Sequence, residues 1–337
     1  MLAARGLTDA GVPVALTERA RQRHLFSLHA RLEVEYRDGP GRGQPSRLFL
    51  KLPLVESPLS RVMIADEARF YLAFGDDPGL PLVRWLAADP DPEHPSLVLD
   101  DLSDTHTTPA GPVPASRRQT EAMIDALARF HARWWEDPAL GVAVGERWDA
   151  AMVARTYSLV QEHYARFRDL TGDAVSPGRL AVYEAVLPAW PGLARRLVGL
   201  DRLTLIHGDA HSWNCLFPRD PEKDPAYLVD LSTCRIRTPA NDLAYMMAVM
   251  WFPDLRRRWE LPMLRRYHDR LMAAGVSGYA WEDLWWDYRF AVIVHLFTPV
   301  HQAAGGEVPP STWWYNLERV HAAFEDLDCR ALLNATG

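Results

Sequence analysis

The alternation of apolar and polar positions divides the chain into a strand-rich start and a largely helical remainder. Residues 24–36 alternate roughly, and residues 47–52 alternate cleanly with three leucines on one face. We therefore expect two strands here, with a turn-rich break at residues 39–44 between them. Pro53 ends the second strand, because proline lacks the N–H group that a sheet ladder needs.

Helical spacing follows at residues 62–74. Ile64, Tyr71 and Phe74 fall on one face of this predicted helix, and Glu67 falls on the same face. A carboxylate on an apolar stripe requires a partner, because a buried unpaired charge is costly. Lys51 is our candidate, since it lies on the strand face opposite the leucines and points toward a cleft or solvent.

A short apolar strand at residues 96–99 and a connection rich in Thr, Pro and Gly at residues 105–115 indicate a boundary between two lobes. Ser116 and Gln119 form a capping box that opens a long helix, which we expect to reach about residue 136. One stripe of this helix should be buried, and it consists of Met123, Leu127, Phe130, His131 and Trp134. We interpret the histidine as a core residue with satisfied hydrogen bonds.

The rest of the chain is predicted to be helical, apart from one strand-rich interruption. Helical patterns cover residues 147–200 and the chain after residue 239. The interruption holds short apolar strands at residues 203–206, 215–217 and 227–230.

The last two of these strands predict a hairpin around a polar, proline-bounded turn at residues 218–226. If the turn is centred near Glu222, antiparallel pairing places Asn214 opposite Asp230. Asp209 lies five residues before Asn214, in the loop that leads into the hairpin. The hairpin therefore gathers an amide and two carboxylates.

This combination of side chains suits phosphoryl transfer. The reaction needs a divalent ion, hard oxygen ligands for that ion, and a carboxylate near the attacking hydroxyl. We expect Asn214 and Asp230 to bind Mg²⁺ and Asp209 to act as the base. Lys51 would pair with the α- and β-phosphates of the nucleotide, and Glu67 would hold Lys51.

Composition narrows the range of partners. The net charge of −7 and a pI of about 5.9 argue against a broad surface for nucleic acid or anionic membranes. The chain has two lysines, Lys51 and Lys223, against 35 arginines. Since lysine is retained so rarely, we expect Lys51 to serve as a compact point charge, whereas Lys223 lies in a turn and is solvated.

Other features indicate a cytoplasmic enzyme. The chain is 337 residues long, which favours two lobes sharing a cleft. Its three cysteines match no zinc pattern, and their odd number argues against a disulfide framework. Residues 1–14 lack a basic region followed by an apolar core, so we expect no signal peptide. The longest apolar stretch, around residues 244–252, is too short to span a bilayer.

The motif His207-Gly208-Asp209, followed by Asn214 and then Asp230, resembles the catalytic and metal-binding loops of the aminoglycoside phosphotransferase-like kinases. The resemblance is closest to the ecdysteroid-kinase-like (choline-kinase-like) branch. In that branch the metal-binding aspartate is followed by a pattern that is matched here by Arg235, Pro239, Asp242, Leu243 and Tyr245.

Earlier segments match the same family in the same order. Lys51 stands on a strand, Glu67 on a helix, residues 97–102 at the hinge, and residues 127–131 on the following helix. The resemblance covers about residues 45–250. It departs from the family at residues 19–33, which contain no glycine for a phosphate-covering turn, and at Leu231-Ser232, where a bulkier aromatic residue or a glutamine is common.

The resemblance implies an α+β, protein-kinase-like fold with two lobes. Residues 1–102 would form a small antiparallel-sheet lobe that binds the nucleotide, with a hinge at about residues 97–104. Residues 103–337 would form a larger helical lobe with the catalytic hairpin at residues 203–231 and the acceptor pocket.

The same resemblance implies the roles of single residues. Asp209 would be the catalytic base, Asn214 and Asp230 would hold Mg²⁺, and Lys51 would contact the phosphates of ATP. The adenine would meet the backbone of the hinge residues Leu99, Asp100, Asp101 and Leu102. The acceptor would be a hydroxyl on a natural product, sugar, amino alcohol or antibiotic. The sequence leaves open the acceptor's identity, the choice of ATP or GTP, and the oligomeric state.

Two other functions compete with this interpretation. A metal hydrolase could use His207, Asp209 and His211, with His295 and His301 as remote ligands. A nucleotide-binding pseudo-enzyme is the third interpretation, and the retained motif residues argue against it.

Several side chains have two interpretations. We interpret His207 as structural. Asp242 either stabilises a helix start or bonds back to the catalytic loop. Arg235 and Arg237 lie either on the surface or against the substrate. An acidic acceptor pocket could come from Glu282, Asp283 and Asp287, and one or two of the C-terminal tryptophans should line the pocket; these are Trp251, Trp259, Trp281, Trp285, Trp286, Trp313 and Trp314.

Overall fold

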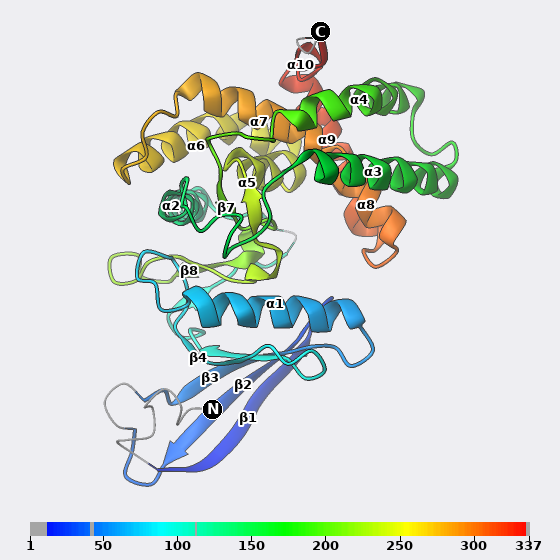
Figure 1. Cartoon of the computed structure of the whole chain (residues 1–337). Helices are drawn as coiled ribbons and strands as arrows, with labels where there is room; N and C mark the ends of the chain where they lie inside the picture. Colours follow the sequence, from blue (N-terminus) through cyan, green and yellow to red (C-terminus); the bar gives the residue numbers. More distant parts are fainter. Residues whose placement is uncertain (1–11, 41–43, 112, 335–337) are drawn as a thin grey trace. The chain divides into compact units, whose positions relative to one another are not determined.

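The computed structural model describes residues 12–40, 44–111 and 113–334, which form two compact units (Figure 1). The first unit contains the chain up to Ala126 together with Trp213–Thr233, and the second contains Leu127–Ser212 and the chain from Cys234 onward. The expectations for residues 1–14 and 39–44 fall partly outside the described residues, at positions 1–11 and 41–43.

The first unit is built on a five-stranded antiparallel sheet with the strand order β1-β2-β3-β5-β4. Its strands are β1 (Pro13–Arg23), β2 (Leu28–Tyr36), β3 (Arg47–Leu52), β4 (Trp85–Asp89) and β5 (Ser96–Asp100). The predicted bounds of β3 are confirmed. The sequence missed β1, because this edge strand is exposed along its whole length and lacks an alternating apolar pattern.

Helix α1 (Pro58–Phe74) packs on β4 and β5. It begins four residues before the predicted start, because Ser57 accepts a hydrogen bond from the backbone N–H of Ser60 and Pro58 suits the first turn. Three residues of the predicted face are buried, namely Ile64, Tyr71 and Glu67, whereas Phe74 at the end of the helix is half-buried.

A second, small sheet completes the first unit. It has the order β6-β8-β9, and its strands are β6 (His106–Thr107), β8 (Cys215–Pro218) and β9 (Tyr227–Leu228). Short 3₁₀ turns flank the hairpin, η2 (Ser212–Asn214) before β8 and η3 (Leu231–Thr233) after β9.

The predicted hairpin is confirmed, but its predicted register is wrong by one residue. Cys215 pairs with Leu228, and the backbone N–H of Val229 donates to the carbonyl of Asn214 at 3.1 Å. Asn214 therefore aligns with Val229. Asp230 has left the ladder, because its backbone adopts a left-handed conformation with φ of 64°.

The hairpin belongs to the first unit, which differs from the predicted split after residue 102. The backbone N–H of Leu228 donates to the carbonyl of Pro81 at 2.8 Å. The η3 turn also packs on α1. These contacts tie the hairpin to α1 and to the segment before β4, within the first unit.

The second unit is mainly helical. Helix α2 (Arg117–Arg133) begins in the first unit and ends in the second. The other helices are α3 (Ala150–Thr171), α4 (Pro177–Arg195), α5 (Ala240–Ala244), α6 (Pro253–Ala273), α7 (Trp281–His295), α8 (Thr298–Gly305), α9 (Pro310–Asp326) and α10 (Arg330–Asn334). An antiparallel sheet and a helical remainder confirm the expected α+β fold class.

The capping box before α2 is confirmed. The Ser116 backbone N–H donates to Gln119 Oε1 at 2.9 Å, and the Gln119 N–H donates to Ser116 Oγ at 3.3 Å. All five residues of the predicted stripe are buried, which explains why its spacing was readable: Met123, Leu127, Phe130, His131 and Trp134.

Two short elements of the second unit escaped prediction. Strand β10 (Arg235–Arg237) pairs antiparallel with β7 (Thr204–Ile206). Tyr245–Val249 forms a π-helical segment, η4, directly after α5. Strands of three residues are too short for a periodic pattern, and π-helical segments are frequent near functional sites.

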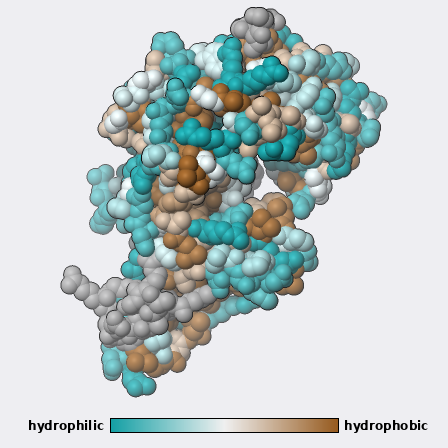
Figure 2. Space-filling view, in the orientation of Figure 1, coloured by the Kyte–Doolittle hydropathy of each residue, from teal (hydrophilic) through white to brown (hydrophobic). Residues whose placement is uncertain are grey.

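The surface of Figure 2 intersperses hydrophilic and apolar side chains. Among the described residues, no helix is both long enough and apolar enough to cross a membrane. All three cysteines are free thiols.

Candidate active site

Lys51 is held between two carboxylates in the first unit. Its Nζ atom lies 2.6 Å from Glu67 Oε2 and 3.0 Å from Asp230 Oδ1. The side chain is buried, with 6% exposure. The predicted pairing of Lys51 with Glu67 is therefore confirmed, and Lys51 points into the protein.

Charge in this cluster favours the lysine cation. Burial alone would lower the pKa of Lys51, but the charges of Glu67 and Asp230 outweigh it and raise that pKa above its ordinary value. The second oxygen of Glu67 accepts a hydrogen bond from the Leu231 backbone at 3.2 Å. Glu67 thus connects strand β3, helix α1 and the hairpin.

Asp230 stands in a strained backbone position. A non-glycine residue in the left-handed region costs on the order of 1–3 kcal/mol, and such residues cluster at functional sites. Lys51 and Ser232 Oγ both donate to its Oδ1, the serine at 3.1 Å. These bonds fix the carboxylate, whose side chain remains about one-third exposed at 33%.

Asn214 ends the η2 turn beside Val229, the residue that precedes Asp230. Its side chain is nearly buried. An amide oxygen and a carboxylate are hard donors of the kind that Mg²⁺ takes from proteins, together with water and phosphate oxygens. The two residues therefore fit a magnesium ion.

The segment Leu99–Leu102, predicted to be the hinge, begins in β5, which lies between β3 and β4 in the sheet. Leu99 is buried, and the backbone N–H of Asp100 donates to the Arg84 carbonyl at 3.0 Å. The carboxylate of Asp100 pairs with Arg84 at 2.9 Å, and that of Asp101 lies 3.5 Å from Arg31. Both side chains are thus engaged within the sheet unit.

The turn between β1 and β2 forms without glycine. The His24 backbone N–H donates to the carbonyl of Ser27 at 2.8 Å. The rings of His24 and His29 lie 4.1 Å apart between centroids. Histidines therefore occupy the region in which the family often has glycine, and no local pattern in the chain predicted this pair.

The loop around Asp209 is held by one buried carboxylate in the second unit. Asp242 Oδ2 accepts from the His207 backbone at 2.7 Å, and Oδ1 accepts from the Gly208 backbone at 2.8 Å. Gly208 has a φ of 84°, which favours glycine. Of the two interpretations of Asp242, the bond back to the loop is the one observed.

His131 and His207 make the structural contacts that were predicted for them. His131 is fully buried and bonds Tyr267 Oη at 2.8 Å and Asp242 Oδ2 at 3.1 Å. His207 Nδ1 accepts from the Asp209 backbone N–H at 3.3 Å. Burial would raise the pKa of Asp242, but the hydrogen bond and charge of His131 outweigh it and lower that pKa.

The Asp209 carboxylate has two polar neighbours. Its Oδ2 lies 3.4 Å from His211 Nε2, and Tyr245 donates a hydrogen bond to it. Burial would raise the pKa of Asp209, but the charge of His211 and these hydrogen bonds hold it below the ordinary range. Asp209 is therefore ionised at neutral pH. The contact with Tyr245 was missed, although Tyr245 stands three residues after Asp242 in the family pattern.

The histidines proposed for a metal hydrolase are engaged elsewhere. His295 Nε2 bonds the Asn241 carbonyl at 3.0 Å, and His295 Nδ1 bonds Thr298 Oγ1 at 2.9 Å. His301 Nδ1 lies 2.7 Å from His163 Nδ1. In the described part of the chain no three His, Cys, Asp or Glu side chains form a group suited to a metal ion.

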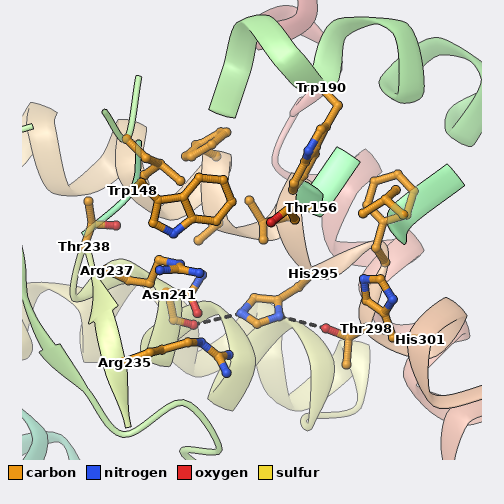
Figure 3. Close-up of a pocket in the computed structure, with 16 residues that line it drawn as sticks. Trp148, Thr156, Trp190, Arg235, Arg237, Thr238, Asn241, His295, Thr298 and His301 are labelled. Atoms are coloured by element: carbon orange, nitrogen blue, oxygen red, sulfur yellow. Dashed lines mark hydrogen bonds between the residues drawn. The ribbon is translucent and has the colours of Figure 1, made fainter. Parts of the chain in front are cut away.

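A cavity of about 270 Å³ opens in the second unit (Figure 3). Its aromatic wall comes from Trp148, Trp190, Phe290 and Phe297, and its polar lining includes Arg235 and Arg237. The sequence did not decide whether these two arginines lie on the surface or contact a substrate. In the structure both line this cavity.

The expected acidic pocket is not at this cavity. Asp287 is buried and accepts from Tyr279 Oη at 2.9 Å, and Asp283 pairs with Arg202. Among the residues that the structure describes, none of the C-terminal tryptophans lines the cavity, since the indoles there are Trp148 and Trp190. Tryptophans of α7 instead stack on one another, as Trp281 does on Trp285.

Comparisons with solved structures show the fold. The chain matches a GDP complex of an aminoglycoside 2'-phosphotransferase with a TM-score of 0.58 and 12% identity, covering 100% of this chain and 99% of the other. It matches the microcompartment-associated aminopropanol kinase with a TM-score of 0.55 and 15% identity, covering 100% and 98%. It matches a macrolide 2'-phosphotransferase from Brachybacterium faecium with a TM-score of 0.54 and 17% identity, covering 99% and 96%.

A search of curated proteins gave no match. The family model described as "Phosphotransferase enzyme family" matches residues 11–285, which is most of the chain. This match confirms the resemblance to the aminoglycoside phosphotransferase-like kinases, while the narrower ecdysteroid-kinase-like branch stays a prediction. The chain belongs to the phosphotransferase enzyme family.

Proposed function

We propose that the protein transfers the γ-phosphate of ATP, or of GTP in its place, to a hydroxyl group of a small molecule. The observation that carries this proposal is the position of Lys51 between Glu67 and Asp230. A buried lysine that keeps its charge and ends beside a partly exposed carboxylate offers a cation for nucleotide phosphates next to a proposed metal ligand.

In this proposal the first unit binds the nucleotide. Lys51 pairs with the α- and β-phosphates, and Glu67 holds it in place. The backbone of Leu99–Leu102 contacts the purine ring of the nucleotide. Asn214 and Asp230 hold Mg²⁺, which when bound neutralises charge on the phosphates.

Asp209 orients the acceptor hydroxyl and takes its proton. The hydroxyl oxygen then forms a bond to the γ-phosphorus while the bond to the bridging oxygen breaks, and the nucleoside diphosphate leaves. Asp209 is five residues from Asn214 in the chain, and a fully extended segment of that length spans at most about 18 Å. Asp209 therefore lies no farther than this from Asn214.

The acceptor belongs, in our proposal, to the second unit. The solved relatives are named for aminoglycosides, a macrolide and aminopropanol. They support a small alcohol as acceptor rather than a nucleic acid or a membrane component. An enzyme that consumes ATP works where ATP is supplied, which favours a cytoplasmic location.

The test is a screen of alcohols for nucleotide-dependent phosphorylation. Natural products, sugars, amino alcohols and antibiotics are each incubated with ATP or GTP, with and without Mg²⁺. Mass spectrometry follows the phosphorylated product, and Asp209→Asn serves as the inactive control. Product that forms without nucleotide, or equally with Asp209→Asn, would refute the proposal. Binding of Mg²⁺-nucleotide without any transfer would favour the pseudo-enzyme.

A further inference from the structure

The cavity of the second unit carries positive charge. Arg235 and Arg237 lie two residues apart on β10, so both side chains point to the same face of the strand, while Ile236 is buried on the other face. Figure 3 shows both guanidinium groups directed into the cavity toward His295.

Neither arginine is neutralised there. Arg237 stacks on Trp148, with its guanidinium carbon 4.5 Å from the ring centroid, and donates to the Ile236 carbonyl at 2.6 Å. Arg235 donates to the Gly208 carbonyl at 3.3 Å. Within the described residues, neither is paired with a carboxylate, and the 16 residues that line the cavity include no Asp or Glu.

The other polar groups of the cavity supply no negative charge. The Asn241 carbonyl accepts from His295 Nε2, so this nitrogen carries the proton and Nδ1 accepts from Thr298. Burial lowers the pKa of His295 to about 4, so the ring is neutral at pH 7. Burial together with the charge of Arg235 lowers the pKa of Arg237 to about 9, which a bound anion would relieve.

We propose that this cavity holds the acceptor and selects one with a carboxylate beside a compact apolar body. The proposal rests on the proposed kinase function and specifies its substrate class. A guanidinium group matches a carboxylate through two parallel hydrogen bonds, and the aromatic wall suits an apolar body. Polycationic aminoglycosides are disfavoured, because like charges would meet at the two arginines.

Arg235 links the cavity to the loop that carries Asp209. The same guanidinium group that lines the cavity bonds the carbonyl of Gly208, which immediately precedes Asp209. A carboxylate held by the arginines therefore anchors the acceptor beside the loop that carries the base. At about 270 Å³ the cavity is near the lower end of ligand pockets, so the body of the acceptor must be compact.

The test compares matched probes by equilibrium binding and by turnover. Three hydroxylated scaffolds, with a benzene ring, a cyclohexane ring or a straight six-carbon chain, are each prepared as the carboxylate, the amide and the amine. Calorimetry with the full chain measures binding without nucleotide. We expect at least one carboxylate to bind about tenfold or more tightly than its amide, with the amine weakest. If, for all three scaffolds, the amide or the amine binds as tightly as the carboxylate, the proposal is wrong.

Variants assign the preference to the arginines. Arg237→Gln and Arg235→Gln should each reduce the carboxylate-to-amide ratio about tenfold. Arg237→Lys should reduce the carboxylate-to-amide affinity ratio less than Arg237→Gln does. Lysine keeps the positive charge but lacks the planar guanidinium group that forms two parallel hydrogen bonds. Arg265→Gln is the matched control, since Arg265 also stacks on a tryptophan, Trp281, but does not line the cavity. A ratio that survives both glutamine variants in folded protein overturns the assignment.

Two additional measurements distinguish a carboxylate site from a phosphate site and from a site without catalysis. Inorganic phosphate is titrated as a competitor, because the arginines could serve the transferred phosphoryl group instead. In that case phosphate would bind while no carboxylate exceeded its amide, which would overturn the proposal. A carboxylate that binds selectively but is never phosphorylated would refute the role of the cavity as the acceptor site and leave the anion site standing, while the screen of alcohols tests the kinase function separately. Phosphorylation that favours amides or amines would refute the anion site and leave the kinase function standing.

Discussion

Glu67 holds Lys51 through a contact of 2.6 Å, and both side chains are almost completely buried. Removing one partner of a buried ion pair leaves the other charge without compensation, which typically costs about 3–5 kcal/mol. The pair joins strand β3 to helix α1, so its loss should destabilise the whole first unit.

We predict that Glu67→Gln lowers the free energy of unfolding by about 3 kcal/mol and weakens nucleotide binding. Urea unfolding measures the first effect and calorimetry the second. Asp66→Asn is the control on the same helix, since the ion pair between Asp66 and Arg69 is exposed and should contribute less than about 1 kcal/mol. Equal losses in the two variants would contradict the prediction.

Replacing the two aspartates of the proposed chemistry should give different defects. Asp209→Asn should reduce turnover about 10²–10⁴-fold while nucleotide affinity is kept, because Asp209 acts on the acceptor. Asp230→Asn should weaken Mg²⁺-dependent nucleotide binding as well. Turnover and nucleotide titrations measure the two effects.

Asp169→Asn is the control for this pair of variants, since Asp169 is an exposed carboxylate on α3. It should leave both turnover and nucleotide affinity unchanged. Full activity in Asp209→Asn, or unaltered magnesium dependence in Asp230→Asn, would show that the roles are assigned wrongly.

Asp242 positions the loop before Asp209 by accepting two backbone hydrogen bonds. Asp242→Ala leaves buried N–H donors unsatisfied, at about 1–3 kcal/mol each. We predict that kcat falls strongly while the KM for nucleotide changes little, because our proposal places the nucleotide in the first unit. Asp242→Asn keeps one acceptor oxygen and should retain more activity than the alanine variant. This role would be contradicted if kcat and the KM for nucleotide changed together. It would also be contradicted if Asp242→Ala and Asp242→Asn had equal activity.

Stability should fall in mild acid because His295 is buried in its neutral form. Its pKa is lowered from 6.5 to about 4 in the folded protein. Between these two pH values the unfolded chain binds a proton that the folded protein does not, so stability decreases as pH falls from 6.5 toward 4. The full effect is about 3 kcal/mol, at about 1.36 kcal/mol per pKa unit.

Urea unfolding between about pH 7.5 and pH 4.5 measures this dependence. His295→Gln should reduce the slope of unfolding free energy against pH, while burial of His29, His301 and His321 in their neutral forms maintains part of it. His94→Gln should leave the slope unaltered, because the His94 side chain is 92% exposed. An unchanged slope in His295→Gln would assign the acid sensitivity to other groups.

The sequence alone determined the elements with strong local signals. Strand β3 was readable from its alternating residues, helix α1 from apolar residues at helical spacing, and the start of α2 from its capping box. The pairing of Lys51 with Glu67 was also predictable, since a lone carboxylate on an apolar stripe requires a cation. The phosphotransferase family followed from a motif that is compact in the chain.

Tertiary structure decided what depends on contacts between distant residues. The hairpin register differs from the prediction by one residue, and the left-handed backbone of Asp230 lies beyond the paired strands. Asp242 reached the loop before Asp209 across 34 residues, which no local pattern encodes. The charge of the cavity likewise came from β10, a strand of three residues too short to predict, whose pairing with β7 places two arginines on one face. The spacing of apolar residues indicates which face of a helix or strand is buried. The residues that this face contacts are distant in the chain, so they are known only from the tertiary structure.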